Sequence, residues 1–296
     1  MVSVILPTYN RAVYLRDSIR SVLQQEGVGL ELIIVDDGST DDTETLVSSF
    51  RDDRIRYYKL PHTGRLSAMK NFAIERSRGG LLAFMDSDDL WTPGKLARQW
   101  RLLQDHPDVG FSLTDITVFR DNATIKEYTY RMRGAVECVD IFPWITGSGF
   151  VVYNPTLLLH RGCLEHTGYF DETQRSGCLK FNMRLAYHYK CGVFFEPMLL
   201  RRLHGSNVSE EKRFANYDEY LNAYERFYAE GKIGKGRLLK ARGNAFFKLG
   251  ELHAAEQRAG EARKNYLLAL KNDPFKARYY RRLIKSFLKG GRRNLT

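Results

Sequence analysis

The chain has 296 residues, a hydrophobic content of 43% and a formal net charge of +11. This composition is typical of a globular protein, and no apolar run approaches the roughly 18 residues that a membrane-spanning helix needs. An integral membrane protein is therefore excluded, and without a standard secretion signal we expect a cytoplasmic protein. The four cysteines form no C-x-x-C pair, and an intracellular chain would keep them reduced.

The positive charge is concentrated at the C-terminal end. From Lys232 onward there are 18 Lys and Arg against 4 Asp and Glu, whereas residues 1–231 contain 28 against 31. This asymmetry predicts two modules, 1–231 and 232–296, that have different partners.

Strand and helix patterns alternate over the first hundred residues. Apolar, β-rich runs occur at residues 2–7, 30–35 and 81–85. Helical patterns separate or follow them at residues 15–23, after a capping box Asp41-x-x-Glu44, at about 66–78 and at about 93–106. The alternation predicts an α/β fold with a mostly parallel, Rossmann-like sheet flanked by helices.

The basic C-terminal extension has a helical pattern. One stretch has the spacing of a tetratricopeptide-type helix pair, at Phe246, Leu249, Gly250, Ala262, Tyr266, Ala269 and Pro274, although His253 departs from the usual aromatic. A single repeat cannot form a solenoid, so we expect one helical hairpin that caps the preceding domain.

The last predicted helix is amphipathic. Its apolar side is formed by Tyr280, Leu283, Ile284, Phe287 and Leu288, and Arg281, Arg282, Lys285 and Lys289 surround it. Such a helix either lies on an anionic membrane surface or covers the preceding hairpin. Nucleic acid is not an expected partner, because no recognition motif accompanies the basic residues.

Acidic side chains follow two of the predicted strands. Asp36 and Asp37 come directly after the second run, and Asp86-Ser87-Asp88-Asp89 after the third. Ligands of open α/β sheets bind beyond the carboxyl ends of the strands, and clustered carboxylates repel one another unless a cation lies between them. A divalent cation with oxygen ligands is therefore predicted there, and it would hold a diphosphate, because no P-loop or G-x-G-x-x-G motif is present.

These segments resemble a known family. "VSVILPTYNRAVYLRDSIRSVL", "ELIIVDDGSTDDT", "GRLSAMKNFAI" and "LLAFMDSDDLWTPGKLARQ" are similar to the family-two inverting glycosyltransferases, which have the GT-A fold. The resemblance covers roughly residues 2–209, since "NPTLLLHRGCLEHTGYFDE" and "LHGSNVS" also fit the family. It implies Mn²⁺ or Mg²⁺ as cofactor and a nucleotide-sugar donor, with UDP favoured.

The resemblance also implies roles for individual residues. Pro7, Thr8 and Tyr9 would line the nucleotide pocket, Asp37 would accept a hydrogen bond from the base, and Asp86 would lie near the ribose. Asp88 would bind the metal, with His204 as a second metal or phosphate contact. Arg65 would either contact the diphosphate or be a solvated loop residue, and His62 stands where the family often has Asn.

The catalytic base that the resemblance implies is missing from its expected place in the sequence. Inversion needs a general base that takes the acceptor proton, and the family supplies it from a Glu-Asp pair six residues before an Arg. Counting back from Arg184 gives Gly177 and Cys178, and a thiol with a pKa of about 8.5 is a poor base near pH 7. Asp171 and Glu172 are the remaining weak candidates.

The resulting hypothesis is a metal-dependent transferase that moves a sugar, with inversion, onto a hydroxyl of a glycan, glycolipid or protein, in the synthesis of a bacterial-type surface polysaccharide. We expect it to be cytoplasmic, with peripheral attachment to the membrane through the basic extension. The alternative is a non-catalytic binding or docking protein that lacks the base. A nucleotidyltransferase fits the motifs less well.

Overall fold

A computed structural model describes residues 1–121, 123–127, 136–148, 150–205 and 213–290. The chain divides into two compact units, Met1–Ile145 with Phe150–Gly205, and Thr146–Gly149 with Ser206–Thr296. The division falls near residue 205 and not at 231, because helix α8 (Arg213–Ala229) packs with the helices that follow it.

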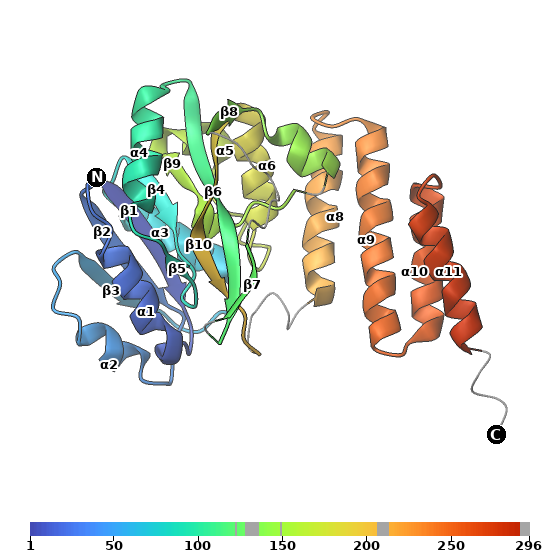
Figure 1. Ribbon diagram of the computed structural model, residues 1–296, viewed down its shortest axis with the longest axis horizontal. Helices are drawn as coiled ribbons and strands as arrows, with labels where there is room; N and C mark the ends of the chain where they lie inside the picture. Colours follow the sequence, from blue (N-terminus) through green and yellow to red (C-terminus); the bar gives the residue numbers. More distant parts are fainter. Residues whose placement is uncertain (122, 128–135, 149, 206–212, 291–296) are drawn as a thin grey trace. The chain divides into compact units, whose positions relative to one another are not determined.

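The first unit is built on one mixed sheet with the order β3-β2-β1-β4-β9-β6-β10-β5 (Figure 1). Its parallel half consists of β1 (Val2–Thr8), β2 (Leu30–Asp36), β3 (Ile55–Lys59) and β4 (Leu81–Phe84). The other half contains β5 (Leu90–Trp91), β6 (Val109–Arg120), β9 (Leu158–His160) and β10 (Lys190–Arg202), with β7 (Ala123–Lys126) on β6 and β8 (Glu137–Val139) on β10. The short β9 is antiparallel to both β4 and β6 and joins the two halves.

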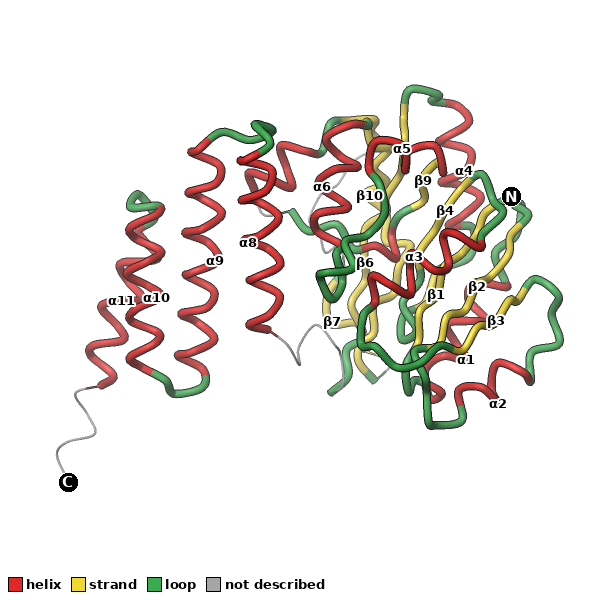
Figure 2. Tube along the Cα trace, turned by 180° about the vertical axis from the view of Figure 1, so that it is seen from behind, coloured by secondary structure: helices red, strands yellow, loops and turns green. Residues whose placement is uncertain are grey.

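Helices cover both faces of this sheet, as Figures 1 and 2 show from opposite sides. They are α1 (Ala12–Leu23), α2 (Thr43–Ser48), α3 (Leu66–Arg76), α4 (Lys95–Asp105), α5 (Leu164–Thr167) and α6 (Cys178–His188). Shorter turns are η1 (Trp144–Ser148), η2 (Asn154–Thr156) and η3 (Arg161–Cys163). The predicted α/β fold is confirmed.

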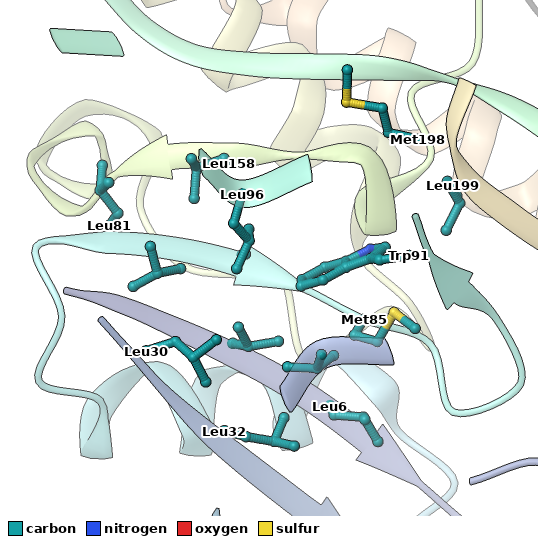
Figure 3. Close-up of a cluster of buried hydrophobic side chains, with 14 of the residues drawn as sticks. Leu6, Leu30, Leu32, Leu81, Met85, Trp91, Leu96, Leu158, Met198 and Leu199 are labelled. Carbon is teal, nitrogen blue, oxygen red and sulfur yellow. The ribbon is translucent and has the colours of Figure 1, made fainter. Parts of the chain in front are cut away.

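The hydrophobic core accounts for the two-residue repeat of apolar side chains in the strands and for their three-to-four-residue repeat in the helices. Every second residue of β1 (Val2, Val4, Leu6) lies in one buried cluster together with Leu15 and Ile19, which are four residues apart on α1. Figure 3 shows part of this cluster, in which Leu6 of β1 lies near Leu32 of β2. All seven positions of β1 and of β2 are buried, because a central parallel strand is covered on both faces.

The predicted capping box does not form. The N-cap residue of α2 is Asp42, which makes no side-chain cap. Asp41 accepts hydrogen bonds from the Thr43 amide at 3.1 Å and, across the chain, from the Ala12 amide at 3.0 Å. Its carboxylate therefore ties the turn after β2 to the start of α1 and leaves the first turn of α2 without that cap.

The second unit consists of helices. After α8 come α9 (Lys235–Ala255), α10 (Ala259–Asn272) and α11 (Ala277–Gly290), each packed on its predecessor. Gly250 on α9 has Tyr266 of α10 against it, and a Cβ at this glycine would lie 2.6 Å from the ring. The predicted helical hairpin is present as α9 and α10, and its likeness to a tetratricopeptide repeat stays a prediction. Among the described residues, no helix is both long and apolar enough to span a bilayer.

Candidate active site

The end of β2 carries two acids with different surroundings. Asp36 accepts hydrogen bonds from the Ser39 amide at 2.8 Å and the Tyr57 hydroxyl at 2.5 Å, so it shapes the turn. Asp37 is 1% exposed and accepts hydrogen bonds from the amides of Thr63 at 2.8 Å and Gly64 at 2.7 Å. Asp37 therefore anchors the loop before α3, and a contact with a nucleobase stays a prediction.

The predicted nucleotide-binding residues of β1 lie next to this loop. Tyr9 is 40% exposed and stacks on His62, which also pairs with Asp37, with ring centroids 4.2 Å apart. Pro7 is buried in β1. The hydroxyl of Thr8 is buried and has no hydrogen-bond partner within the described part of the chain. Arg65, which was predicted to contact the diphosphate or to be a solvated loop residue, is exposed at the start of α3.

The acids after β4 are held against the end of β10. Asp88 Oδ2 lies 2.9 Å from His204 Nε2, and the His204 ring stacks on Tyr14 at 4.4 Å. Asp89 accepts a hydrogen bond from the Arg202 amide at 2.9 Å. The two strand ends are thus joined through side chains 116 positions apart in the sequence.

The carboxylates of Asp86, Asp88 and Asp89 repel one another. Burial raises the pKa of Asp86, Asp88 raises it further, and Lys70 and Arg201 oppose the shift. Burial together with Asp88 and Asp86 raises the pKa of Asp89 well above its ordinary value. A cation at this point would relieve the repulsion.

The donor set fits a divalent metal. The described residues contain no preformed group of three metal-binding side chains. They do contain the pair Asp88 and His204, whose atoms lie 2.9 Å apart. Two ligands at about 2.1 Å from one Mn²⁺ or Mg²⁺ ion and at a right angle are about 3 Å apart, so this pair can share a metal whose other ligands are phosphate and water.

The residues that stand at the expected base position in the sequence lie at the N-terminus of α6. Gly177 is the N-cap residue with φ +60°, and Cys178 accepts a hydrogen bond from Lys70 Nζ at 3.1 Å. Asp171 pairs with Lys180 at 2.5 Å. Burial alone would raise the pKa of Asp171, but the hydrogen bonds from Lys180 and Thr173 outweigh it and lower the pKa to about 2. Glu172 is exposed and accepts a hydrogen bond from Asn71 Nδ2 at 2.7 Å.

Sequence reasoning missed Lys70 and Arg201. Lys70 is 3% exposed on α3, near Cys178, the Phe170 ring (5.1 Å) and the charge of Asp86. The sequence does contain a sign that Lys70 is buried, because it lies three residues after Ser67 and four before Ile74 in a predicted helix. This spacing places all three residues on one face, and all three are buried. Arg201 lies at the end of β10, where no local pattern distinguishes it from other basic residues.

A mixed sheet covered by helices on both faces, with acids at the carboxyl ends of its parallel strands, defines the class of this protein as α/β. The model of glycosyl transferase family 2 matches residues 3–161, and the chain belongs to that family. It is 36% identical over 126 residues to the putative teichuronic acid biosynthesis glycosyltransferase TuaG of Bacillus subtilis, a match that covers 42% of this chain and 50% of that protein.

Solved structures share the fold. The S. aureus TarS fragment 1–349 in complex with UDP-GlcNAc has a TM-score of 0.66 and 17% identity, and the alignment covers 98% of this chain and 92% of that one. The Pyrobaculum calidifontis mannosyltransferase PcManGT in complex with GDP-Man and Mn²⁺ has a TM-score of 0.59 and 18% identity, over 99% and 88% of the chains. The predicted GT-A fold is thereby confirmed.

Proposed function

We propose that this protein transfers a sugar, with inversion, from a nucleotide-linked donor to a hydroxyl group of a glycan, glycolipid or protein. The observation that carries the proposal is the contact of 2.9 Å between Asp88 and His204 at the carboxyl edge of the sheet, beside the buried charges of Asp86 and Asp89, in a family 2 chain. The nucleotide-sugar complexes of TarS and PcManGT support a donor of this class, and UDP is our first choice.

The donor is held by the first half of the sheet. Tyr9, Thr8 and Asp37 surround the base, Asp86 contacts the ribose, and Arg65 contacts the diphosphate. Asp88 and His204 would hold Mn²⁺ or Mg²⁺. When bound, the metal supplies Lewis-acid stabilisation of the departing diphosphate.

The acceptor proton needs a base. In a single displacement the acceptor oxygen forms its bond to the anomeric carbon while the bond to the diphosphate breaks, and no enzyme nucleophile is needed. Asp171 is unsuited, because a pKa of about 2 lies far from the operating pH. We assign the proton to Glu172, which is exposed and whose carboxylate accepts a hydrogen bond from Asn71 of α3.

A binding or docking protein without activity is the second hypothesis, and family membership together with the names of the relatives favours the transferase. Similarity to TuaG, a putative teichuronic acid biosynthesis glycosyltransferase, supports a cell-surface polymer as the acceptor. The location we propose is the cytoplasmic face of a membrane, with peripheral attachment.

The test is release of nucleoside diphosphate from a panel of nucleotide sugars with Mn²⁺, with Mg²⁺ and with chelator. We expect metal-dependent binding and release with at least one donor, and Asp88→Ala should abolish both. Asp108→Ala, which removes an exposed acid from a surface pair with Lys190, is the matched control. Tight nucleotide binding that needs no metal and survives Asp88→Ala contradicts the proposal, and binding without release on any acceptor supports the docking hypothesis.

A further inference from the structure

Helix α11 has two apolar rows. The inner row contains Tyr279, which is 0% exposed, and Leu283, and both pack into the core of the helical unit. Tyr279 stacks on Phe247 at 4.8 Å, and its hydroxyl donates a hydrogen bond to Asn244 at 2.8 Å. The inner row therefore accounts for the packing of α11 on the hairpin.

The outer row is largely exposed, although the ring of Phe287 also lies under the guanidinium of Arg263 of α10, 4.4 Å from the ring centroid. Tyr280, Ile284 and Phe287 repeat at intervals of four and three residues, and they are 47%, 59% and 55% exposed. Their spacing places them in one stripe along the helix. The sequence prediction that the apolar residues lie on one side is correct only in part, since they form an inner and an outer row. The side chain of Leu288 lies outside the described residues.

Basic residues accompany the outer row. The segment Ala277–Gly290 contains no acidic residue and has five basic ones, Arg278, Arg281, Arg282, Lys285 and Lys289. Arg282 pairs with Glu251 at 2.9 Å and thus faces α9. Arg281 and Lys285 are exposed and each follows directly after a residue of the outer row, which places them about 100° around the helix from it.

The combination of an exposed apolar row with basic residues fits one kind of binding partner. A second copy of this chain would bring the same positive charge to the contact and be repelled. Nucleic acid would use the charges and leave the apolar row in water. An anionic lipid bilayer uses both, since headgroups attract Arg and Lys while aromatic and aliphatic side chains enter the acyl boundary.

We propose that the outer face of α11, formed by Tyr280, Ile284, Phe287, Arg281 and Lys285, docks on an anionic membrane surface with the helix lying in its plane. The inference specifies the surface that makes the proposed peripheral attachment. Its test needs no donor or metal, so a failure of the transfer reaction and a failure of docking can be told apart.

The experiment is co-sedimentation of the full chain with vesicles of phosphatidylcholine alone or with about a third phosphatidylglycerol, at low and high salt. We expect binding to the anionic vesicles only, with a loss of at least tenfold at high salt. Tyr280→Ser with Ile284→Ser and Phe287→Ser should reduce the partition coefficient by at least tenfold. The matched control, Ile125→Ser with Val151→Ser and Tyr228→Ser, removes equally exposed apolar residues elsewhere and should bind normally.

A second pair of variants tests the charges. Arg281→Gln with Lys285→Gln should weaken binding by about fivefold per residue, whereas Lys240→Gln with Lys248→Gln on α9 should change it less. Ile284→Trp, compared with the parent chain, should give a blue-shifted emission on addition of anionic vesicles. Equal binding of the serine triple variant and its control, no emission shift, or no vesicle binding by the parent chain would each overturn the proposal. A gel-shift with short RNA that depends on the charges alone, without vesicle binding, would identify a nucleic-acid surface instead.

Discussion

Replacing Asp171 by Asn tests whether this acid stabilises the fold or performs the chemistry. Its carboxylate lies 2.5 Å from Lys180 Nζ and accepts two further hydrogen bonds from Thr173. These contacts lower the pKa of Asp171 from 3.8 to about 2. Because the folded pKa lies below the unfolded one, the carboxylate contributes stability that is fully present above about pH 4 and is lost as the pH falls through about 2.

The magnitude follows from the size of the shift. A depression of almost two pKa units corresponds to at most about 2.5 kcal/mol. The Asp171 side chain is 14% exposed, so solvent screening reduces the expected contribution to about 1–2 kcal/mol. Urea unfolding of Asp171→Asn should show this loss of unfolding free energy at pH 7 and roughly half of it at pH 3.

The control and the activity assay complete this experiment. Asp108→Asn also removes a Lys–Asp pair, with Lys190 at 2.8 Å, but both side chains are more than half exposed, so stability should stay within experimental error. Nucleoside diphosphate release should persist in Asp171→Asn and fall by about 10²–10⁴-fold in Glu172→Gln, with unchanged donor affinity. If Asp171→Asn is as stable as the parent and has lost turnover, Asp171 is the base and our assignment is wrong.

Three further predictions concern single positions. Gly177→Ala should destabilise the protein by about 1 kcal/mol or more in thermal unfolding, since φ is +60° and a Cβ would lie 3.0 Å from the Asp171 amide; an unchanged melting temperature would contradict this. Cys178→Asp should leave turnover unchanged, because Lys70 Nζ, 3.1 Å from the Cys178 sulfur, would pair with the new carboxylate and lower its pKa, as Lys180 does for Asp171; a rise in turnover at constant donor affinity would contradict this. Thr8→Val should leave the stability of the protein unchanged or raise it, because the hydroxyl that it removes is buried and has no partner among the described residues. The same change should weaken nucleotide binding about fivefold in a titration, and unaltered affinity would exclude Thr8 from the donor site.

The parts of the fold that the sequence predicted are those with a local pattern. The apolar runs of β1, β2 and β4 and the apolar face of α1 are short-range signals, and all of them form as expected. The acids at the strand ends follow from the same pattern, because a strand that ends at Asp36 or before Asp86 places its next residues at the carboxyl edge.

The polar contacts of the site could not be predicted from local sequence patterns. Lys70 meets Cys178 across 108 positions and Asp88 meets His204 across 116. Such pairs depend on how α3, α6 and β10 pack. The Asp41 carboxylate, likewise, could either form the predicted capping box of α2 or bind a backbone amide elsewhere in the fold. The packing favoured the amide of Ala12 over the predicted cap.

The antiparallel strand β9 has a consequence for how the chain folds during synthesis. The strands β3, β2, β1 and β4 can pair once residue 84 has been made, since all four come from the first part of the chain. β6, which ends at Arg120, connects to β4 only through residues 158–160 of β9. The apolar strand β6 therefore has no link to the first four strands until about 40 further residues have been made. The same sequence separation between paired strands raises the contact order of this half of the sheet, so we expect it to form after the parallel half.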